Sequence, residues 1–255
     1  MLIAFDIGNS HISFGGFKGE ELTFVASIAT DDRQTGEQYA CVLRSVFSLY
    51  GVEPKDVDGA VLCSVVPAVT PIIQAAIRLL CGCPVLVLGS GVRTGLNLRI
   101  DQPRALGNDL VADAVCALNR CKLPCVVVDL GTAITFTVLD RAGTLVGTSI
   151  AAGMAISLAA LKQWAAQLPT VQPVAPKQVI GRNTIAAMQS GAVYGTASMV
   201  DGMLARIARE LGEQPEVLLT GGTSELISPL LVTPHTDLPY ATLHGLRIIW
   251  QKNRA

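Results

Sequence analysis

The chain has 255 residues, of which 50% are hydrophobic and 15% are charged, and its formal net charge is −1. This length allows one large or two small domains with a sizeable core, and the near-zero charge excludes a strongly basic nucleic-acid-binding domain. Because the charged fraction lies below the usual quarter, apolar surface remains to be covered. A subunit interface would cover it, and the alternative is a low-charge monomer with a large core.

Three runs of strand-forming residues open the chain, and turns that contain glycine separate them. Apolar residues at helical spacing follow, and Pro67 ends the next apolar run. The first half therefore predicts strands at 2–6, 11–17, 22–28, 59–66 and 84–88, helices at 37–50, 68–81 and 108–120, and a loop over 89–103.

The second half repeats this order. We expect strands at 125–129, 133–139, 144–150 and 216–220, and helices at 153–167, at 184–212, shortly after Gly222, and at 242–252. Strands mixed with helices in two similar halves predict an α/β fold, in which each half begins with antiparallel strands and continues with parallel ones. We expect two duplicated domains, over residues 1–119 and 120–255.

One short pattern occurs in both halves. Residues 2–10 read Leu-Ile-Ala-Phe-Asp-Ile-Gly-Asn-Ser and residues 125–133 read Cys-Val-Val-Val-Asp-Leu-Gly-Thr-Ala, so Asp6 and Asp129 are at equivalent positions. A glycine after a buried strand lets backbone N–H groups approach an anion, and a nearby carboxylate can hold Mg²⁺ through water. Hydroxyl groups in the same segments come from Ser10, Thr132 and Thr135. Two such loops predict a nucleotide phosphate site, and the alternative is that both motifs only end strands.

The cysteines and the N-terminus indicate the compartment. The seven cysteines are odd in number, contain no CxxC spacing and lie mostly in apolar runs, so we interpret them as small buried hydrophobes in a reducing compartment. The first apolar run has no basic flank and is interrupted at Asp6, unlike a signal peptide, and the longest run, 150–161, is too short to cross a bilayer. We expect a cytoplasmic protein without nucleic-acid or membrane partners.

Five segments together resemble a known family. They are Cys-Ser-Val-Val-Pro (63–67), Gly-Asn-Asp-Leu (107–110), Asp-Leu-Gly-Thr-Ala (129–133), Gly-Arg-Asn-Thr (181–184) and Thr-Gly-Gly (220–222). Their sequence and order resemble type III pantothenate kinases, within the actin, hexokinase and Hsp70 superfamily. The resemblance covers essentially the whole chain. It implies two duplicated ribonuclease H-like, actin-like ATPase domains around a nucleotide cleft, and a homodimer.

The resemblance also implies an activity and a set of roles. The activity is ATP-dependent phosphorylation of pantothenate to 4'-phosphopantothenate, the first step of coenzyme A biosynthesis, with Mg²⁺ and with K⁺ or NH₄⁺. Asp109 corresponds to the catalytic base, Asp129 to the ligand of the monovalent cation, and Asp6 to a Mg²⁺ contact through water. The implied ATP contacts are Asp6, Ile7, Gly8, Asn9, Ser10, His11, Ile12, Ser13, Thr132, Gly221 and Gly222. The implied substrate contacts are Ile100, Gly107, Asn108, Asp109, Leu110 and Thr184, the last across the dimer interface.

Asp109 stands where a helix is expected to begin. The helix N-terminus favours an ionised carboxylate, so we expect a low pKa, and the alternative role is that of a helix cap. Two departures fall on the substrate side: Leu110 stands where the family has Arg, and Ile100 where it commonly has Tyr. Leucine cannot pair with a carboxylate as arginine does. Two rival functions follow: a kinase for another small hydroxyl compound, and a nucleotide-binding or regulatory homologue with little activity.

Overall fold

The computed structural model describes residues 1–254, and the chain forms two compact units. The first unit contains Met1–Leu96, Asp101–Cys116 and the segment from Thr242 onward. The second contains Asn97–Ile100 and Ala117–Ala241. Each unit is built around one β-sheet. The domain division expected at residue 119 stays a prediction.

The first unit has a five-stranded sheet with the order β3-β2-β1-β4-β5. Its central strand β1 is antiparallel to β2 and parallel to β4. Because helices cover both faces, its inner strands are apolar on both sides. The strands are β1 (Leu2–Ile7), β2 (His11–Lys18), β3 (Glu21–Ala29), β4 (Gly59–Ser64) and β5 (Val85–Val87).

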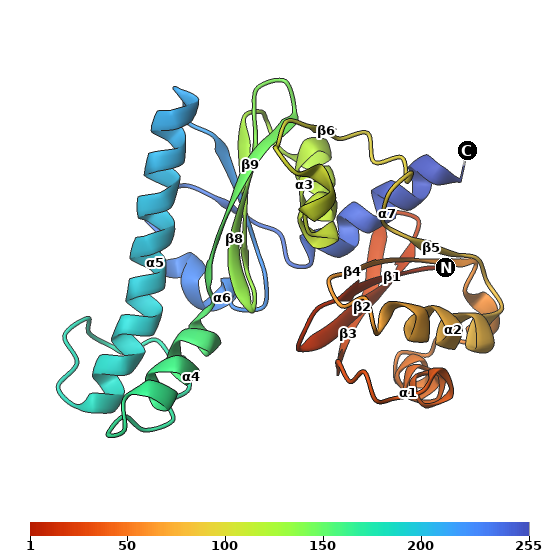
Figure 1. Ribbon diagram of the computed structural model, residues 1–255, viewed down its shortest axis with the longest axis horizontal. Coiled ribbons are helices and arrows are strands. Elements are labelled where there is room, and N and C mark those ends of the chain that lie inside the picture. The colour runs from red at the N-terminus through yellow and green to blue at the C-terminus, as the bar shows by residue number, and fades with distance from the viewer. Residues whose placement is uncertain (255) are drawn as a thin grey trace. The chain divides into compact units, whose positions relative to one another are not determined.

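Helices α1 (Gly36–Leu49) and α2 (Thr70–Cys81) pack on one face of this sheet (Figure 1). The other face packs against apolar residues of α3 (Asn108–Arg120) and α7 (Ala241–Asn253). Short 3₁₀ turns occur at Pro54–Asp56 and Pro103–Ala105. The segment between β5 and α3, expected as a loop, also contains the two-residue strand β6 (Asn97–Leu98), which belongs to the sheet of the second unit.

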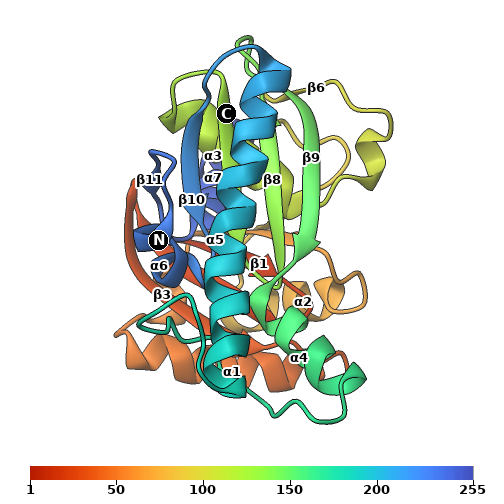
Figure 2. The ribbon, with the colours of Figure 1, turned by 90° about the vertical axis from the view of Figure 1, so that its left-hand side faces the viewer.

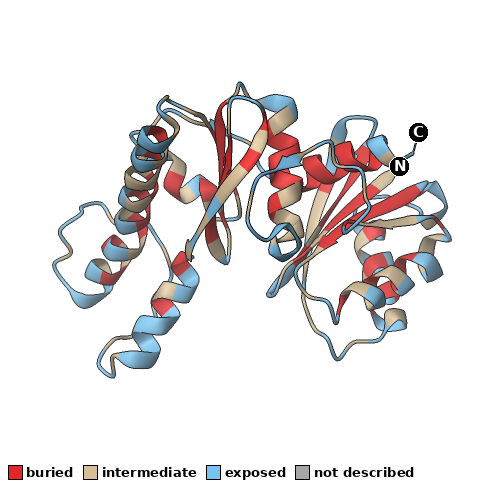
Figure 3. Ribbon diagram, turned by 45° about the horizontal axis from the view of Figure 1, so that its top comes forward, coloured by how far each residue is buried: buried red, intermediate tan, exposed pale blue. Residues whose placement is uncertain are grey.

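The second unit has a six-stranded sheet with the order β11-β10-β7-β8-β9-β6. The long helix α5 (Thr184–Leu211) lies along one face (Figure 2), where its apolar side joins the core with Met154 of α4 (Met154–Trp164) and Ile227 of α6 (Ser224–Ile227). A 3₁₀ turn at Ser228–Leu230 follows α6. The strands are β7 (Cys125–Leu130), β8 (Ala133–Leu139), β9 (Thr144–Ala152), β10 (Glu216–Thr220) and β11 (Thr236–Asp237). Buried residues concentrate in the strands and on the sheet-facing side of α5 (Figure 3).

The two sheets repeat one topology, as the sequence predicts. β1 to β5 correspond in order and direction to β7 to β11. A register shift falls between Gly16 and Phe17 of β2 and between Val138 and Leu139 of β8, at the same distance from each preceding loop. The expected strands and long helices are present, with ends that differ by at most three residues. The helix after Gly222 is a single turn, and β11 was not predicted because two residues carry no alternating pattern.

Among residues 1–254, none of the helices combines the length and apolar character that crossing a membrane requires.

Candidate functional site

The loop between β1 and β2 in the first unit is closed by backbone hydrogen bonds. The Gly8 N–H donates to the His11 carbonyl oxygen (3.0 Å), and the Thr30 N–H donates to the Ser10 carbonyl oxygen (3.1 Å). The Thr30 hydroxyl also donates to the Gly8 carbonyl oxygen (2.7 Å). Asn9, Ser10 and His11 are exposed. The loop thus presents polar groups on a fixed backbone.

Ile7 and Ile12 flank this loop but point into the core. Both side chains are 0% exposed and belong to the apolar cluster beneath α1 and α2. A ligand in the loop could therefore meet these two residues only through their backbone atoms. Ser13 is half-buried and lies directly opposite Asp6 in the β1–β2 register.

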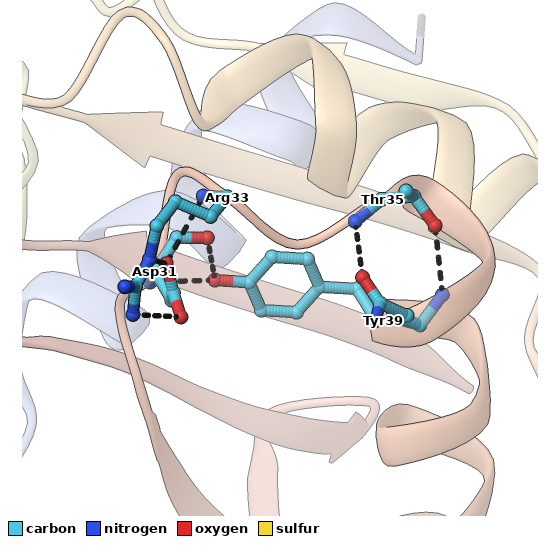
Figure 4. Close-up of polar contacts among 5 residues, drawn as sticks. Asp31, Arg33, Thr35 and Tyr39 are labelled. Carbon is cyan, nitrogen blue, oxygen red and sulfur yellow. Dashed lines mark hydrogen bonds and ion pairs between the residues drawn. The ribbon is translucent and has the colours of Figure 1, made fainter.

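The segment after Thr30 is anchored to helix α1 (Figure 4). The Asp31 N–H donates to the Tyr39 hydroxyl oxygen (2.9 Å), and that hydroxyl donates to the Asp31 carbonyl oxygen (3.0 Å). Arg33 donates twice to the Asp31 carboxylate, which holds the pKa of Asp31 at about 2. Thr35 and Gln38 form a reciprocal cap at the start of α1. These contacts fix the chain that in turn fixes the Gly8–Ser10 loop.

The corresponding loop of the second unit is closed by the same backbone bonds. The Gly131 N–H donates to the Ala133 carbonyl oxygen and the Gly153 N–H donates to the Thr132 carbonyl oxygen, both at 3.1 Å. A Cβ on Gly153 would lie 2.4 Å from the carbonyl oxygens of Gly131 and Thr132, so only glycine fits there. The Thr132 side chain is exposed at the tip of the loop.

Asp6 is the penultimate residue of β1 and lies between two polar neighbours. Its register partners are Ser13 on β2 and Cys63 on β4. The Cys63 thiol, which is 0% exposed, donates to Asp6 Oδ1 at 3.3 Å. Burial and the negative charge of Asp109 raise the pKa of Asp6 to about 6, and the thiol hydrogen bond opposes this rise. Cys63, expected to be only a small buried hydrophobe, therefore contacts a candidate site residue.

Asp109 lies in the first turn of α3, in the same unit as Asp6. Its Oδ1 accepts a hydrogen bond from the Leu110 N–H (2.9 Å). Burial raises the pKa of Asp109, although backbone N–H groups at the helix start lower it. The expected low pKa was wrong, because the loss of hydration outweighs the helix terminus. The first unit thus brings two interacting carboxyl groups together beside the Gly8–Ser10 loop.

The residues around Asp109 are fixed from both sides. Gly107 and Asn108 precede it, and the Asn108 amide donates to the Ser64 carbonyl oxygen at the end of β4 (3.4 Å). Leu110 is only 5% exposed, so its side chain is turned inward rather than toward a solvent-accessible ligand. Ile100 is half-buried and belongs to the second unit.

Asp129 is the penultimate residue of β7 and has different neighbours. Its register partners are Thr135 on β8 and Thr220 on β10. Gly221 has φ +97°, and a Cβ there would lie 2.3 Å from Asp129 Oδ1, so the backbone passes directly against the carboxylate. Thr135 is 9% exposed, and its Oγ1 has no hydrogen-bond partner among the described residues. This set of oxygen atoms suits a hard cation.

Thr223 supports the second loop with two hydrogen bonds. The Thr223 N–H and hydroxyl both donate to the Leu130 carbonyl oxygen (3.1 and 2.8 Å). Gly222 is exposed, with open space around its Cα. Residues 1–254 contain no cluster of three or more His, Cys, Asp or Glu side chains that could enclose a metal. A cation in either unit would therefore need ligands beyond protein carboxylates, such as water or phosphate oxygens.

Thr184 begins α5 and lines a pocket in the second unit. The Asn183 side chain caps this helix by accepting from the Ala186 N–H (2.9 Å). The pocket has a volume of about 680 Å³. It is lined by residues of α4 and of the segment that enters α5, among them Leu158, Leu161, Gly181, Arg182 and Thr184.

Sequence reasoning missed several residues that hold the candidate site. Thr30, Gly153 and Thr223 bind the two loops through hydrogen bonds, and Cys63 binds Asp6. The repeat itself could have indicated Cys63. When the two halves are aligned, Cys63 and Thr220 occupy equivalent positions. Each is the register partner of the aspartate in its own half, so a hydrogen-bonding side chain lies beside each aspartate.

Comparisons with known proteins agree on one family and one fold. A family model described as type III pantothenate kinase matches residues 2–206. A protein described as type III pantothenate kinase from Moorella thermoacetica is 38% identical over 253 residues, which cover 99% of this chain and 100% of that relative.

Solved structures resemble this chain at low sequence identity. Component A of (R)-2-hydroxyglutaryl-CoA dehydratase from Acidaminococcus fermentans has a TM-score of 0.59 at 13% identity, over 100% of this chain and 99% of that one. ROK hexokinase from Thermus thermophilus has a TM-score of 0.52 at 14% identity, over 99% of each chain. These similarities establish the duplicated actin-like fold and nothing beyond the fold.

Proposed function

Because the chain belongs to the type III pantothenate kinase family, we propose that it transfers the terminal phosphate of ATP to the primary hydroxyl of pantothenate. The product is 4'-phosphopantothenate, and the reaction is the first step of coenzyme A biosynthesis. The observation that carries the proposal is the interacting pair of Asp6 and Asp109 beside a glycine loop with exposed polar groups.

Asp109 acts as the general base. Phosphoryl transfer needs a group that orients the attacking hydroxyl and accepts its proton as the new bond forms. Burial raises the pKa of Asp109, and a carboxylate with a raised pKa is a stronger proton acceptor. Its anchoring by Asn108 and by its own helix start keeps the carboxylate in one orientation.

Asp6 and the Gly8–Ser10 loop hold the Mg²⁺–ATP side of the reaction. Mg²⁺ keeps several waters and takes one or two carboxylates together with phosphate oxygens. A carboxylate near the end of a strand, with no enclosing cluster of three or more metal-binding side chains within residues 1–254, fits that requirement. The metal supplies neutralisation of the phosphate charge when bound, and its charge would keep Asp6 ionised.

Asp129 holds a monovalent cation, K⁺ or NH₄⁺. Support comes from the oxygen-rich surroundings: the carboxylate, the unpartnered Thr135 hydroxyl oxygen and the close backbone of Gly221. Thr132 at the tip of the same loop contacts the phosphates of ATP, and Gly221 together with the open Gly222 admits the adenosine.

The substrate side includes Ile100, Gly107, Asn108, Leu110 and Thr184. The inward-turned Leu110 leaves no charged group at the position where the family has Arg. We therefore expect a high apparent KM for pantothenate together with ordinary ATP binding, since an absent ionic contact typically costs a few kcal/mol.

One coupled assay tests the proposal. The full chain is mixed with ATP, Mg²⁺, K⁺ and pantothenate, and ADP release and the phosphorylated product are measured together. Formation of 4'-phosphopantothenate supports the proposal. ADP release with another small alcohol, but not with pantothenate, would favour the rival kinase, and nucleotide binding without turnover would favour the regulatory homologue.

The chain forms a homodimer through the region of α4 and the start of α5. Many of its large exposed hydrophobic side chains lie between β9 and the first residues of α5, namely Ile150, Ile156, Leu161, Trp164, Val174, Val179, Ile180 and Ile185. Exposed hydrophobic residues gathered in one segment favour a surface that another chain covers. Sedimentation at micromolar concentration should give a dimer, and a monomer would contradict it.

Seven free thiols suit a cytoplasmic location.

A further inference from the structure

A series of hydrogen bonds connects the buried side chain of Tyr39 in α1 to the loop between β1 and β2. The Tyr39 hydroxyl binds both backbone groups of Asp31 (Figure 4): it accepts from the N–H (2.9 Å) and donates to the carbonyl oxygen (3.0 Å). The preceding residue, Thr30, binds the loop. Its N–H donates to the Ser10 carbonyl oxygen (3.1 Å), and its hydroxyl donates to the Gly8 carbonyl oxygen (2.7 Å). Two consecutive residues therefore join the helix to the loop.

The Tyr39 end of this connection is rigid. The ring is 1% exposed and belongs to the apolar cluster beneath α1 and α2. The Tyr39 N–H donates to the Thr35 carbonyl oxygen (3.1 Å) in the first turn of α1, and Thr35 and Gln38 cap the same turn. A hydroxyl that both donates and accepts on a buried ring is held in one orientation. Tyr39 therefore fixes both peptide groups that flank the Cα of Asp31.

The Thr30 end of the connection sets the direction of a loop N–H group. In a trans peptide the C=O and the following N–H point in opposite directions, and the Gly8–Asn9 bond is trans. Because the Gly8 carbonyl oxygen accepts from the Thr30 hydroxyl, the Asn9 N–H points away from Thr30. Asn9 is exposed, and no group among residues 1–254 accepts a hydrogen bond from its N–H. A backbone N–H that is open and fixed in direction suits an anionic oxygen.

The corresponding loop of the second unit lacks this connection. Gly153 stands in the place of Thr30 and makes the same backbone bond, from its N–H to the Thr132 carbonyl oxygen. Glycine has no side chain for a second bond, and a Cβ there would lie 2.4 Å from two carbonyl oxygens. The side-chain hydrogen bond from this position to the loop is therefore specific to the first unit, where the two interacting carboxyl groups lie.

Given the proposed function, in which the first loop holds Mg²⁺–ATP, we propose that Thr30 and Tyr39 are positioning residues for the ATP phosphates. Both act through the loop backbone rather than by contacting the nucleotide. Tyr39 fixes Asp31 and thereby Thr30, and Thr30 holds the Gly8 carbonyl so that the Asn9 N–H donates to a phosphate oxygen. A loop that is already in its binding geometry loses less binding free energy to ordering. Removal of the connection should therefore weaken ATP binding.

Calorimetric titration with Mg²⁺–ATP tests the proposal without requiring turnover. Tyr39→Phe removes both hydrogen bonds to Asp31 and keeps the buried ring. We expect the Kd for ATP to rise about 2- to 10-fold, the range that one net hydrogen bond supplies. Tyr50→Phe is the matched control, because Tyr50 ends the same helix and its hydroxyl donates to the Val25 carbonyl oxygen in the middle of β3 (2.9 Å). The control should bind ATP as wild type does.

Two substitutions at Thr30 provide the second measurement. Thr30→Val removes the hydroxyl at nearly constant volume and should raise the Kd for ATP by a similar factor. Thr30→Ser keeps the hydroxyl and should stay close to wild type. Combining Thr30→Val with Tyr39→Phe should raise the Kd by less than the product of the two single effects, because both residues act along one connection.

Stability measurements separate positioning from a purely structural role. The Tm of each variant is recorded beside its ATP binding. An unchanged Kd for ATP in either Tyr39→Phe or Thr30→Val, with a lower Tm, would overturn the proposal, and so would a double variant whose Kd rises by the full product. If Tyr39→Phe does not fold, the comparison of Thr30→Val with Thr30→Ser decides the outcome.

The same variants distinguish failure of this proposal from failure of the proposed function. With an active wild type, the KM for ATP should rise in Tyr39→Phe while the KM for pantothenate stays unchanged. If wild type binds ATP but does not phosphorylate pantothenate, the proposed function is wrong, and the Kd values still decide the roles of Thr30 and Tyr39.

Discussion

The two units share a topology but surround their equivalent aspartates with different groups. In both, the aspartate is the penultimate residue of the first strand, a glycine loop follows, and two matching backbone hydrogen bonds close that loop. Asp6 has a buried thiol donor and a second carboxyl group nearby, and its pKa is raised to about 6. Asp129 has threonine neighbours and the backbone of Gly221.

Duplication therefore fixes the position of each carboxylate in its sheet, whereas the neighbouring groups determine its protonation and the ligand that it binds. A carboxyl group paired with another acid is costly to ionise and gains from a divalent cation. A carboxylate beside threonine hydroxyl groups can hold a monovalent cation.

The largest effect is expected at Asp109, which has no counterpart in the second unit under the proposed roles. Asp109→Asn should lower kcat by about 10²–10⁴-fold, the usual contribution of a general base, and should leave ATP affinity unchanged. Turnover and nucleotide binding are measured on the same preparation. Asp101→Asn, at an exposed acid in the same unit, is the control. Near-normal turnover would mean that Asp109 only caps the helix and does not act as the general base.

The next effect concerns the monovalent cation. Asp129→Asn should weaken activation by potassium by about tenfold or more, a loss typical of a disturbed metal site, because a neutral amide attracts the cation less. Activity is titrated with KCl at constant ionic strength, with NaCl as the reference. Glu225→Gln, an exposed change in the same unit, serves as the control. A variant that retains the wild-type preference for potassium leaves Asp129 without this role.

The ionised Asp6 carboxylate is expected to lower the stability of the folded chain and to be needed for activity. Its pKa is 3.8 when unfolded and about 6 when folded, so the folded chain binds the proton more tightly. The associated stability is complete below pH 3.8 and is lost as pH rises through 6. Asp6→Asn should therefore raise the unfolding free energy by about 1–3 kcal/mol at pH 7.5 without ligands, and by little at pH 3.5.

Urea unfolding at the two pH values measures this effect on Asp6, with the exposed Asp101→Asn as the reference. The same Asp6→Asn variant should be inactive with ATP and Mg²⁺. If the stability of the variant relative to wild type is the same at both pH values, then burial and Asp109 do not make ionised Asp6 destabilising.

The smallest effect is expected at Cys63, whose thiol donates to Asp6. Cys63→Ala should raise the pKa of Asp6 further, since about 1 kcal/mol of hydrogen bonding to the ionised form is removed. Cys63→Ser keeps a donor and should stay close to wild type. The acid side of the kcat/KM–pH profile reports the shift. Identical profiles for the alanine and serine variants would mean that the thiol does not influence Asp6.

Much of the fold could be predicted because its signals are local. Buried strands and the Asp-x-Gly turns are contiguous patterns, so β1, β2, β7 and β8 were predicted within a residue or two. The strand β11 pairs through only two residues and carries no periodicity. Nothing in the linear order indicates that the segment from Thr242 packs with the first unit.

The candidate site could be predicted only in part. A motif identifies Asp109, but its pKa depends on burial, which sequence spacing does not reveal. Cys63 looked apolar because most buried cysteines are inert, and its contact with Asp6 depends on the register of two strands that lie far apart in sequence. Contacts that cross strands or join distant loops, such as Thr30 with Gly8, have no local signal.

The most direct test measures formation of 4'-phosphopantothenate from ATP and pantothenate by phosphorus NMR, with Mg²⁺, in potassium and then in sodium. Wild type should form the product, and faster in potassium. Asp6→Asn should form almost none in either salt, whereas Asp129→Asn should form it slowly and equally in both. Loss of the potassium preference in Asp6→Asn but not in Asp129→Asn would contradict the division of roles, and no product from wild type would contradict the kinase itself.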